Sequence, residues 1–113
     1  MKLSHYIENN LCVVSIDDDL VLERGSEVRL YVAPFLENEQ IKGMVISCKG
    51  THFIDSSGMG TIASIYRELQ KRQAPLVLCQ LTSQNQEAFA LTGLDKLIRV
   101  YPTEEAALEA LKD

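Results

Sequence analysis

The sequence lacks the features that mark several whole classes of protein. It has no tryptophan, and its 11 lysines and arginines stand against 16 acidic residues, which gives a net charge of -5. Nucleic acids and anionic membranes bind cationic surfaces, so this balance argues against both as partners. No apolar run approaches the roughly 18–20 residues of a membrane span, and the N-terminus has no apolar stretch typical of a signal peptide. We therefore expect a cytoplasmic protein with no segment inserted in a membrane.

Cysteine is scarce, and its pattern is not that of a ligand set. Cys12, Cys48 and Cys79 are odd in number, far apart and each within an apolar stretch. A zinc site needs four ligands at usable spacing, which the chain does not offer, so we expect buried free thiols, no metal and no cofactor. The acidic run at 17–19 differs from a calcium loop, which spaces its acids and closes with a distant glutamate, and we interpret it as a solvated turn.

What the chain does have is an alternation of short apolar runs with helical periodicity. Strands are expected at 10–16, 44–46, 76–79 and 97–101, with a short one at 20–22. Helices are expected to begin near residues 25, 59, 83 and 103. Strands that alternate with helices predict an α/β fold with a mixed or mostly parallel sheet of four to five strands and about four packed helices. Because no linker, repeat or low-complexity tract divides the chain, residues 1–113 are expected to form a single domain.

Several side chains can be assigned to a face or an end from the helical spacing. Pro34 lies inside the first helical pattern and is expected to kink or shorten that helix. The spacing predicts a core-facing stripe on the second helix, which consists of Met59, Ile62, Ala63, Tyr66 and Leu69, and an outward face with Arg67, Glu68, Lys71 and Arg72. It predicts a third helix whose apolar residues are Ala88, Phe89 and Leu91, and which ends at Gly93 in a left-handed conformation.

The segment most informative about function is the strand-to-helix turn at 53–60, which contains two adjacent serines. A serine at a helix start caps free backbone N–H groups in most proteins. The alternative is that one hydroxyl is exposed for phosphorylation, since the amide dipoles of a helix N-terminus tolerate a phosphate. The two glycines of the turn, Gly58 and Gly60, favour a tight turn with close backbone approach, because the complete nucleotide-loop patterns are absent.

No catalytic group is predicted in this turn. His52, Asp55 and Ser56 suggest a hydrolase triad only at first sight, because the turn is not the G-x-S-x-G elbow. His52 lies four residues before Ser56 along an extended segment, so its ring is expected to be too distant to act as a base. We therefore expect a binding module and not an enzyme.

The turn Phe53-Ile54-Asp55-Ser56-Ser57-Gly58-Met59-Gly60 resembles the signature of STAS domains, specifically of bacterial anti-sigma-factor antagonists (anti-anti-sigma factors). The similarity continues at matching spacing through 76–79, 91–98 and 101–107, and it covers the chain from about Met44 to the C-terminus. This resemblance implies a STAS-type mixed sheet and a partner-switching role in transcription regulation.

In that role, the unphosphorylated domain binds a serine-kinase anti-sigma factor and so releases a sigma factor. The same kinase phosphorylates the serine that follows the aspartate, and a phosphatase reverses the reaction. The resemblance thus implies that Ser56 is the phosphoacceptor and that Ser57 caps the helix. It implies a partner-binding switch turn made of Asp55, Ser57, Gly58, Met59 and Gly60.

The sequence also departs from the family pattern at acidic positions near the switch serine. The family's glycine is replaced by Asp18, its aspartate by Val21, and its Asp-Leu pair at the end of the central strand by Ser47-Cys48. The alternative function that we keep open is a STAS subunit that assembles a transport or signalling complex without phosphorylation.

Overall fold

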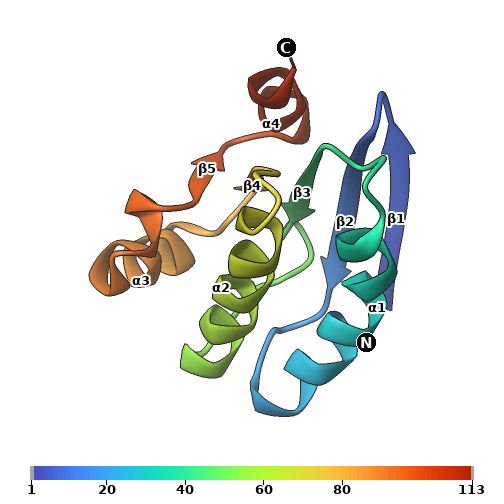
Figure 1. Ribbon diagram of the computed structural model, residues 1–113. Coiled ribbons are helices and arrows are strands. Elements are labelled where there is room, and N and C mark those ends of the chain that lie inside the picture. The colour runs from blue at the N-terminus through green and yellow to red at the C-terminus, as the bar shows by residue number, and fades with distance from the viewer. Residues whose placement is uncertain (1, 113) are drawn as a thin grey trace.

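The five strands form one mixed sheet (Figure 1). The computed structural model describes residues 2–112. The strands are β1 (Lys2–Glu8), β2 (Leu11–Asp17), β3 (Gly43–Ser47), β4 (Leu76–Cys79) and β5 (Arg99–Tyr101). The helices are α1 (Gly25–Glu37), α2 (Ser56–Gln70), α3 (Ser83–Thr92) and α4 (Glu104–Leu111), with short 3-10 turns η1 (Leu22–Arg24) and η2 (Leu94–Lys96).

The sheet has the order β1-β2-β3-β4-β5, so strands that are consecutive in the chain are neighbours in space. β1 runs antiparallel to β2, and the other three pairings are parallel. Parallel neighbours need crossover connections, and α1, α2 and α3 supply them. Within residues 2–112, the expected mixed sheet with about four helices is confirmed.

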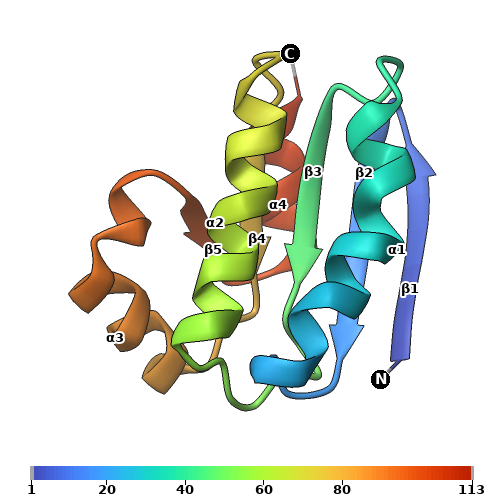
Figure 2. The same ribbon diagram turned by 60° about the horizontal axis from the view of Figure 1, so that its bottom comes forward.

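Helices cover both faces of the sheet, and the core is correspondingly in two layers (Figure 2). The larger layer lies under α1 and α2 and includes Ile46, Ile62 and Phe89, all fully buried. The smaller layer lies under α4, where Val13 and Val45 pack with Ala107 of that helix. Alternate residues of a strand point to opposite faces, so β2, β3 and β4 are apolar on both faces and read as continuous apolar runs.

The first strand, β1, was not predicted. Six of its seven residues are exposed, so it carries no apolar stripe that sequence periodicity could detect. It joins β2 through Asn9 and Asn10, which both have positive φ (53° and 66°), the backbone conformation of a two-residue hairpin turn. The predicted strand at 10–16 accordingly begins one residue later, at Leu11. The Asn-Asn pair is the one sequence signal that could have indicated the hairpin.

Two other local predictions need correction in whole or in part. The short strand expected at 20–22 is an isolated bridge between Leu20 and Ile54, followed by η1. Of the apolar residues of α3, Phe89 is buried and Leu91 is 89 % exposed, because α3 packs mainly through Phe89. Pro34 does not shorten α1, which continues to Glu37; the proline removes its own N–H donor, and the helix continues past that one missing hydrogen bond.

Arg72 was expected to point into solvent, yet its guanidinium joins α2 to the end of α1. It donates hydrogen bonds to the backbone oxygens of Phe35 (3.2 Å), Leu36 (3.0 Å) and Ile41 (2.6 Å). The last carbonyls of a helix have no partner within the helix, so this one side chain caps the C-terminus of α1.

The three cysteines are buried free thiols, as expected. Burial raises the pKa of Cys12 to about 11 and that of Cys48 to about 12. Both thiols are therefore protonated at neutral pH and act as small apolar side chains.

Candidate functional site at the start of α2

The two serines of the turn lie at the first two positions of α2, where the chain arrives from the end of β3. Ser56 is exposed and Ser57 is half-buried. Gly58 and Met59 are buried, and Met59 belongs to the larger core layer. The surface of the turn is therefore formed by Asp55, Ser56 and Gly60, while Met59 fixes α2 against the sheet.

Asp55, not Ser57, is the N-cap of α2. Its backbone is extended (φ -88°, ψ -178°), and its Oδ1 accepts hydrogen bonds from the Gly58 N–H at 2.8 Å and the Ser57 hydroxyl at 2.7 Å. These two hydrogen bonds, that of Ser57 first, hold the pKa of the Asp55 carboxyl below its usual value. The expectation that Ser57 caps the helix was therefore wrong; aspartate is as good an N-cap as serine, and here its carboxylate lies in the capping position.

The hydroxyl groups of Ser56 and Ser57 differ in their hydrogen bonding. The Ser57 hydroxyl donates to Asp55, and the Ser57 carbonyl accepts from the Thr61 hydroxyl at 3.2 Å. The Ser56 hydroxyl has no hydrogen-bond partner among residues 2–112. A modification of Ser56 therefore breaks no internal hydrogen bond, whereas one on Ser57 would displace the side chain that holds the cap.

The two glycines of the turn differ in their surroundings. A Cβ atom at Gly58 would lie 2.3 Å from the Leu20 carbonyl oxygen and 2.9 Å from Cγ2 of Ile54. At Gly60 a Cβ would meet nothing within 4 Å. The expected close backbone approach holds for Gly58, while Gly60 leaves an open place on the exposed side of the helix, one turn after Ser56.

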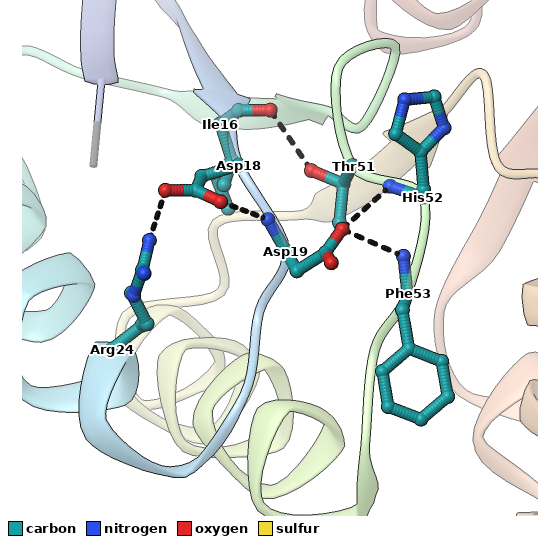
Figure 3. Close-up of polar contacts among 7 residues, drawn as sticks. All are labelled: Ile16, Asp18, Asp19, Arg24, Thr51, His52 and Phe53. Atoms are coloured by element: carbon teal, nitrogen blue, oxygen red, sulfur yellow. Dashed lines mark hydrogen bonds and ion pairs between the residues drawn. The ribbon is translucent and has the colours of Figure 1, made fainter.

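The acidic run expected to be a solvated turn is instead a structural connection to the switch turn (Figure 3). Oδ1 of Asp19 accepts hydrogen bonds from the backbone N–H groups of His52 (3.2 Å) and Phe53 (3.1 Å). The Thr51 hydroxyl donates to the Ile16 carbonyl at 2.8 Å. Together these contacts hold the segment before Ser56 against the end of β2.

Backbone hydrogen bonds also join the loop after β2 to the segment before Ser56. The Leu20 N–H donates to the Phe53 carbonyl at 2.9 Å, and the Asp55 N–H donates to the Leu20 carbonyl at 3.2 Å. Asp18 pairs with Arg24 of η1 (Figure 3). The turn is thus built from two loops that are more than 30 residues apart in the chain, and only the fold brings them together.

Exposed apolar groups flank the turn. The Phe53 side chain is 47 % exposed and that of Leu22 is 73 % exposed. The Leu22 backbone N–H also faces the Asp55 carboxylate and contributes to its lowered pKa. Sequence reasoning did not assign Leu22 to the site, because η1 was predicted as a strand. Apolar groups beside a polar turn are typical of a protein-binding surface.

Val21 and Ser47, which stand where the family pattern has acidic residues, differ in their burial. Val21 is half-buried in the loop beside the turn. Ser47 is buried, on the face of the sheet that α4 covers, and its hydroxyl donates to Oε1 of Gln80 at 3.3 Å. It lines an open polar hollow of about 720 Å³ together with Ser15, Lys49 and Thr103, and this hollow does not include the turn.

Comparison with known proteins decides the family. The family model described as "STAS domain" matches residues 2–107. This chain belongs to the STAS domain family. It is 23 % identical to the anti-sigma F factor antagonist of Paenibacillus polymyxa over 112 residues, which cover 99 % of this chain and 94 % of that protein.

Two solved structures show the same fold. The crystal structure of an anti-sigma factor antagonist from Mycobacterium paratuberculosis has a TM-score of 0.86 at 23 % identity, with 99 % of this chain and 94 % of that chain covered. The phosphorylated form of the Bacillus cell fate determinant SpoIIAA has a TM-score of 0.77 at 18 % identity, with 98 % and 100 % covered. The five-stranded STAS architecture is therefore shared across the whole described chain.

None of the helices within residues 2–112 is both long and apolar enough to cross a membrane. No group of three or more His, Cys, Asp or Glu side chains in the same range is placed to hold a metal ion.

Proposed function

We propose that this STAS domain is a cytoplasmic anti-sigma-factor antagonist that is switched by phosphorylation of Ser56. Unphosphorylated, it binds a serine-kinase anti-sigma factor through the switch turn, the exposed side of α2 and the flanking residues Phe53 and Leu22. The kinase phosphorylates Ser56 and thereby releases the domain, and a phosphatase restores binding. The chain acts as a binding partner, without catalysis of its own, and residues 1–113 act as one domain.

The observation that carries this proposal is the difference between the two serines. Ser56 is exposed and its hydroxyl is unpaired within the described residues, whereas Ser57 is held by Asp55. The cap of α2 is supplied by Asp55, so a phosphate on Ser56 leaves the hydrogen bonds of the helix start in place. A kinase can therefore modify the surface without unfolding the turn.

The charge change accounts for the release. A phosphate adds roughly 1.5 to 2 negative charges at pH 7. Ser56 sits beside the Asp55 carboxylate, in a chain whose net charge is already -5. A partner surface matched to the unphosphorylated turn, where Asp55 carries the only charge, would face about 2.5 to 3 negative charges after phosphorylation and lose complementarity. Gly60, with open space where a Cβ would be, allows the partner backbone to approach next to Ser56.

Isothermal titration calorimetry with the cognate anti-sigma factor tests this function. Ser56→Asp is expected to weaken binding at least about tenfold, the loss that a misplaced interface charge produces. Ser56→Ala, which adds no charge, should bind as the wild type does. Thermal unfolding of each variant confirms that the turn remains folded. Equal affinity of the wild type and Ser56→Asp would contradict the switch.

A further inference from the structure

The outer edge of β1 is an unpaired sheet edge. β1 is the first strand in the sheet order and pairs with β2 on one side only. In both ribbon views no other element of residues 2–112 lies along its free side (Figures 1 and 2). The strand is seven residues long and contains no proline, and Tyr6 and Ile7 are 40 % and 51 % exposed. Such an edge offers a row of backbone donors and acceptors to another strand.

The side chains of this strand are complementary to themselves. We propose that two copies of the chain pair antiparallel through β1, on a two-fold axis at His5. In that register Lys2 of one copy stands opposite Glu8 of the other, at both ends of the interface. Leu3 stands opposite Ile7, so the apolar residues also meet. Ser4 then faces Tyr6 and His5 faces its own copy, while the charged and apolar pairs on either side of them are of the kinds that stabilise an antiparallel sheet.

The contacts within one chain leave Glu8 available for this pairing. Lys2 lies opposite Asp17 of β2, whereas Glu8 lies opposite the apolar Leu11. Glu8 therefore has no cation facing it across β2. In the dimer, Lys2 lies between two carboxylates, its own Asp17 and the Glu8 of the second copy. The second copy thus supplies the opposite charge that Glu8 lacks.

The two faces of the strand agree with the same register. Residues 3, 5 and 7 face α1. The His5 ring packs against the Phe35 ring there, with the ring centroids 4.4 Å apart, and its Nδ1 forms a hydrogen bond of 2.7 Å with the Tyr31 hydroxyl. Tyr6 is fixed on the other face by its hydrogen bond to Glu104 of α4 at 2.5 Å. In this register residue i of one copy lies opposite residue 10 - i of the other, so odd-numbered residues pair with odd-numbered ones. The side chains that face α1 in the two copies therefore lie on the same face of the combined sheet, and the even-numbered side chains share the opposite face.

The dimer is expected to be weak and to leave the switch turn free. One strand pair buries little surface, so we expect a dissociation constant between about 10 µM and 1 mM. β1 is separated from β3, which leads to Ser56, by the full width of β2. Each copy therefore keeps its own switch turn, and pairing through β1 needs no phosphorylation.

A charge-swap experiment tests the register on the untagged full chain. Sedimentation velocity up to about 1 mM is expected to show concentration-dependent dimerisation of the wild type. Lys2→Glu alone and Glu8→Lys alone each place like charges opposite one another at both ends, and each is expected to weaken dimerisation by about tenfold or more. An equimolar mixture of the two variants restores both pairs and should dimerise like the wild type.

The matched control is the mixture of Glu87→Lys with Lys96→Glu, because these exposed residues carry the same charges away from β1. Each of these variants should dimerise like the wild type, alone and mixed. A monomeric wild type at the highest concentration would overturn the proposal. So would a failure of the Lys2→Glu and Glu8→Lys mixture to recover dimerisation.

Cysteine cross-linking gives an independent measurement. The native thiols are buried, so an introduced surface cysteine can be oxidised selectively. His5→Cys lies on the two-fold axis and is expected to form a disulfide with its own copy under mild oxidation. Ile7→Cys stands opposite Leu3, four residues from its own copy, and is expected to stay reduced. Equal cross-linking of the two variants would contradict the register.

Discussion

The Ser57 hydroxyl donates a hydrogen bond of 2.7 Å to the Asp55 carboxylate, and this contact separates the roles of two adjacent serines. It places Ser57 inside the N-terminal cap of α2 and leaves Ser56 exposed at the first helical position.

The cap carboxylate predicts a defined pH dependence of stability. The folded state holds the pKa of Asp55 below its unfolded value, so the cap stabilises the fold above about pH 4 and this contribution is lost as pH falls through the folded pKa. Asp55→Asn keeps an oxygen acceptor but does not titrate. In urea unfolding, the stability difference between the wild type and Asp55→Asn should shrink as pH falls from 6 toward about 3. A difference that stays constant over this range would contradict the role of the ionised cap.

The two glycines of the turn are expected to respond to alanine in opposite directions. Gly58→Ala places a methyl group against Leu20 and Ile54 and should destabilise the fold by about 1–3 kcal/mol, as overpacking does. Gly60→Ala meets no atom and should stabilise the fold by about 0.5–1 kcal/mol, because alanine is the better helix residue. Urea denaturation measures both, and equal effects would refute the assignment of Gly58 to a close contact.

Asp19 is expected to control the mobility of the segment before the switch. Asp19→Ala removes the acceptor of the His52 and Phe53 N–H groups. Hydrogen exchange of these two amides should accelerate, while amides in β4 should keep their wild-type rates, because the lost contacts are local. Unchanged exchange at both positions would show that the loop does not depend on Asp19.

Arg72 is predicted to matter more for stability than its neighbour Lys71, although both directly follow the end of α2. Arg72→Met removes two donors to carbonyls in the last turn of α1 and one donor to the Ile41 carbonyl beyond it, and should cost about 1–3 kcal/mol, because these carbonyls lose charged donors. Lys71 forms only an exposed pair with Glu68, so Lys71→Met should change stability by less than about 0.5 kcal/mol. Equal values in urea unfolding would mean that Arg72 does not cap α1.

Sequence reasoning found the elements with strong periodicity and missed those held by distant contacts. β3 and β4 are buried on both faces and were evident as apolar runs. β1 is mostly exposed and gains its strand conformation from pairing with β2, which no local pattern records. Arg72 and Asp19 are bound by residues more than 30 positions away, so their roles depend on the tertiary fold.

The candidate site shows the same division. The turn and its two serines were recognisable from residues 53–60. The choice of Asp55 as cap was not, because aspartate and serine cap helices about equally well and only the geometry distinguishes them. The contribution of Leu22 was hidden for another reason: its segment forms a 3-10 turn where the apolar run 20–22 predicted a strand.

Phosphorylation by the cognate kinase-type anti-sigma factor is the most direct test of the switch. The wild type, Ser56→Ala and Ser57→Ala are each incubated with this kinase and ATP, and the intact mass and the modified site are read by mass spectrometry. Our account predicts one phosphate on Ser56 in the wild type and in Ser57→Ala, and none in Ser56→Ala. Complete phosphorylation of Ser56→Ala, or a phosphate on Ser57 in the wild type, would contradict it.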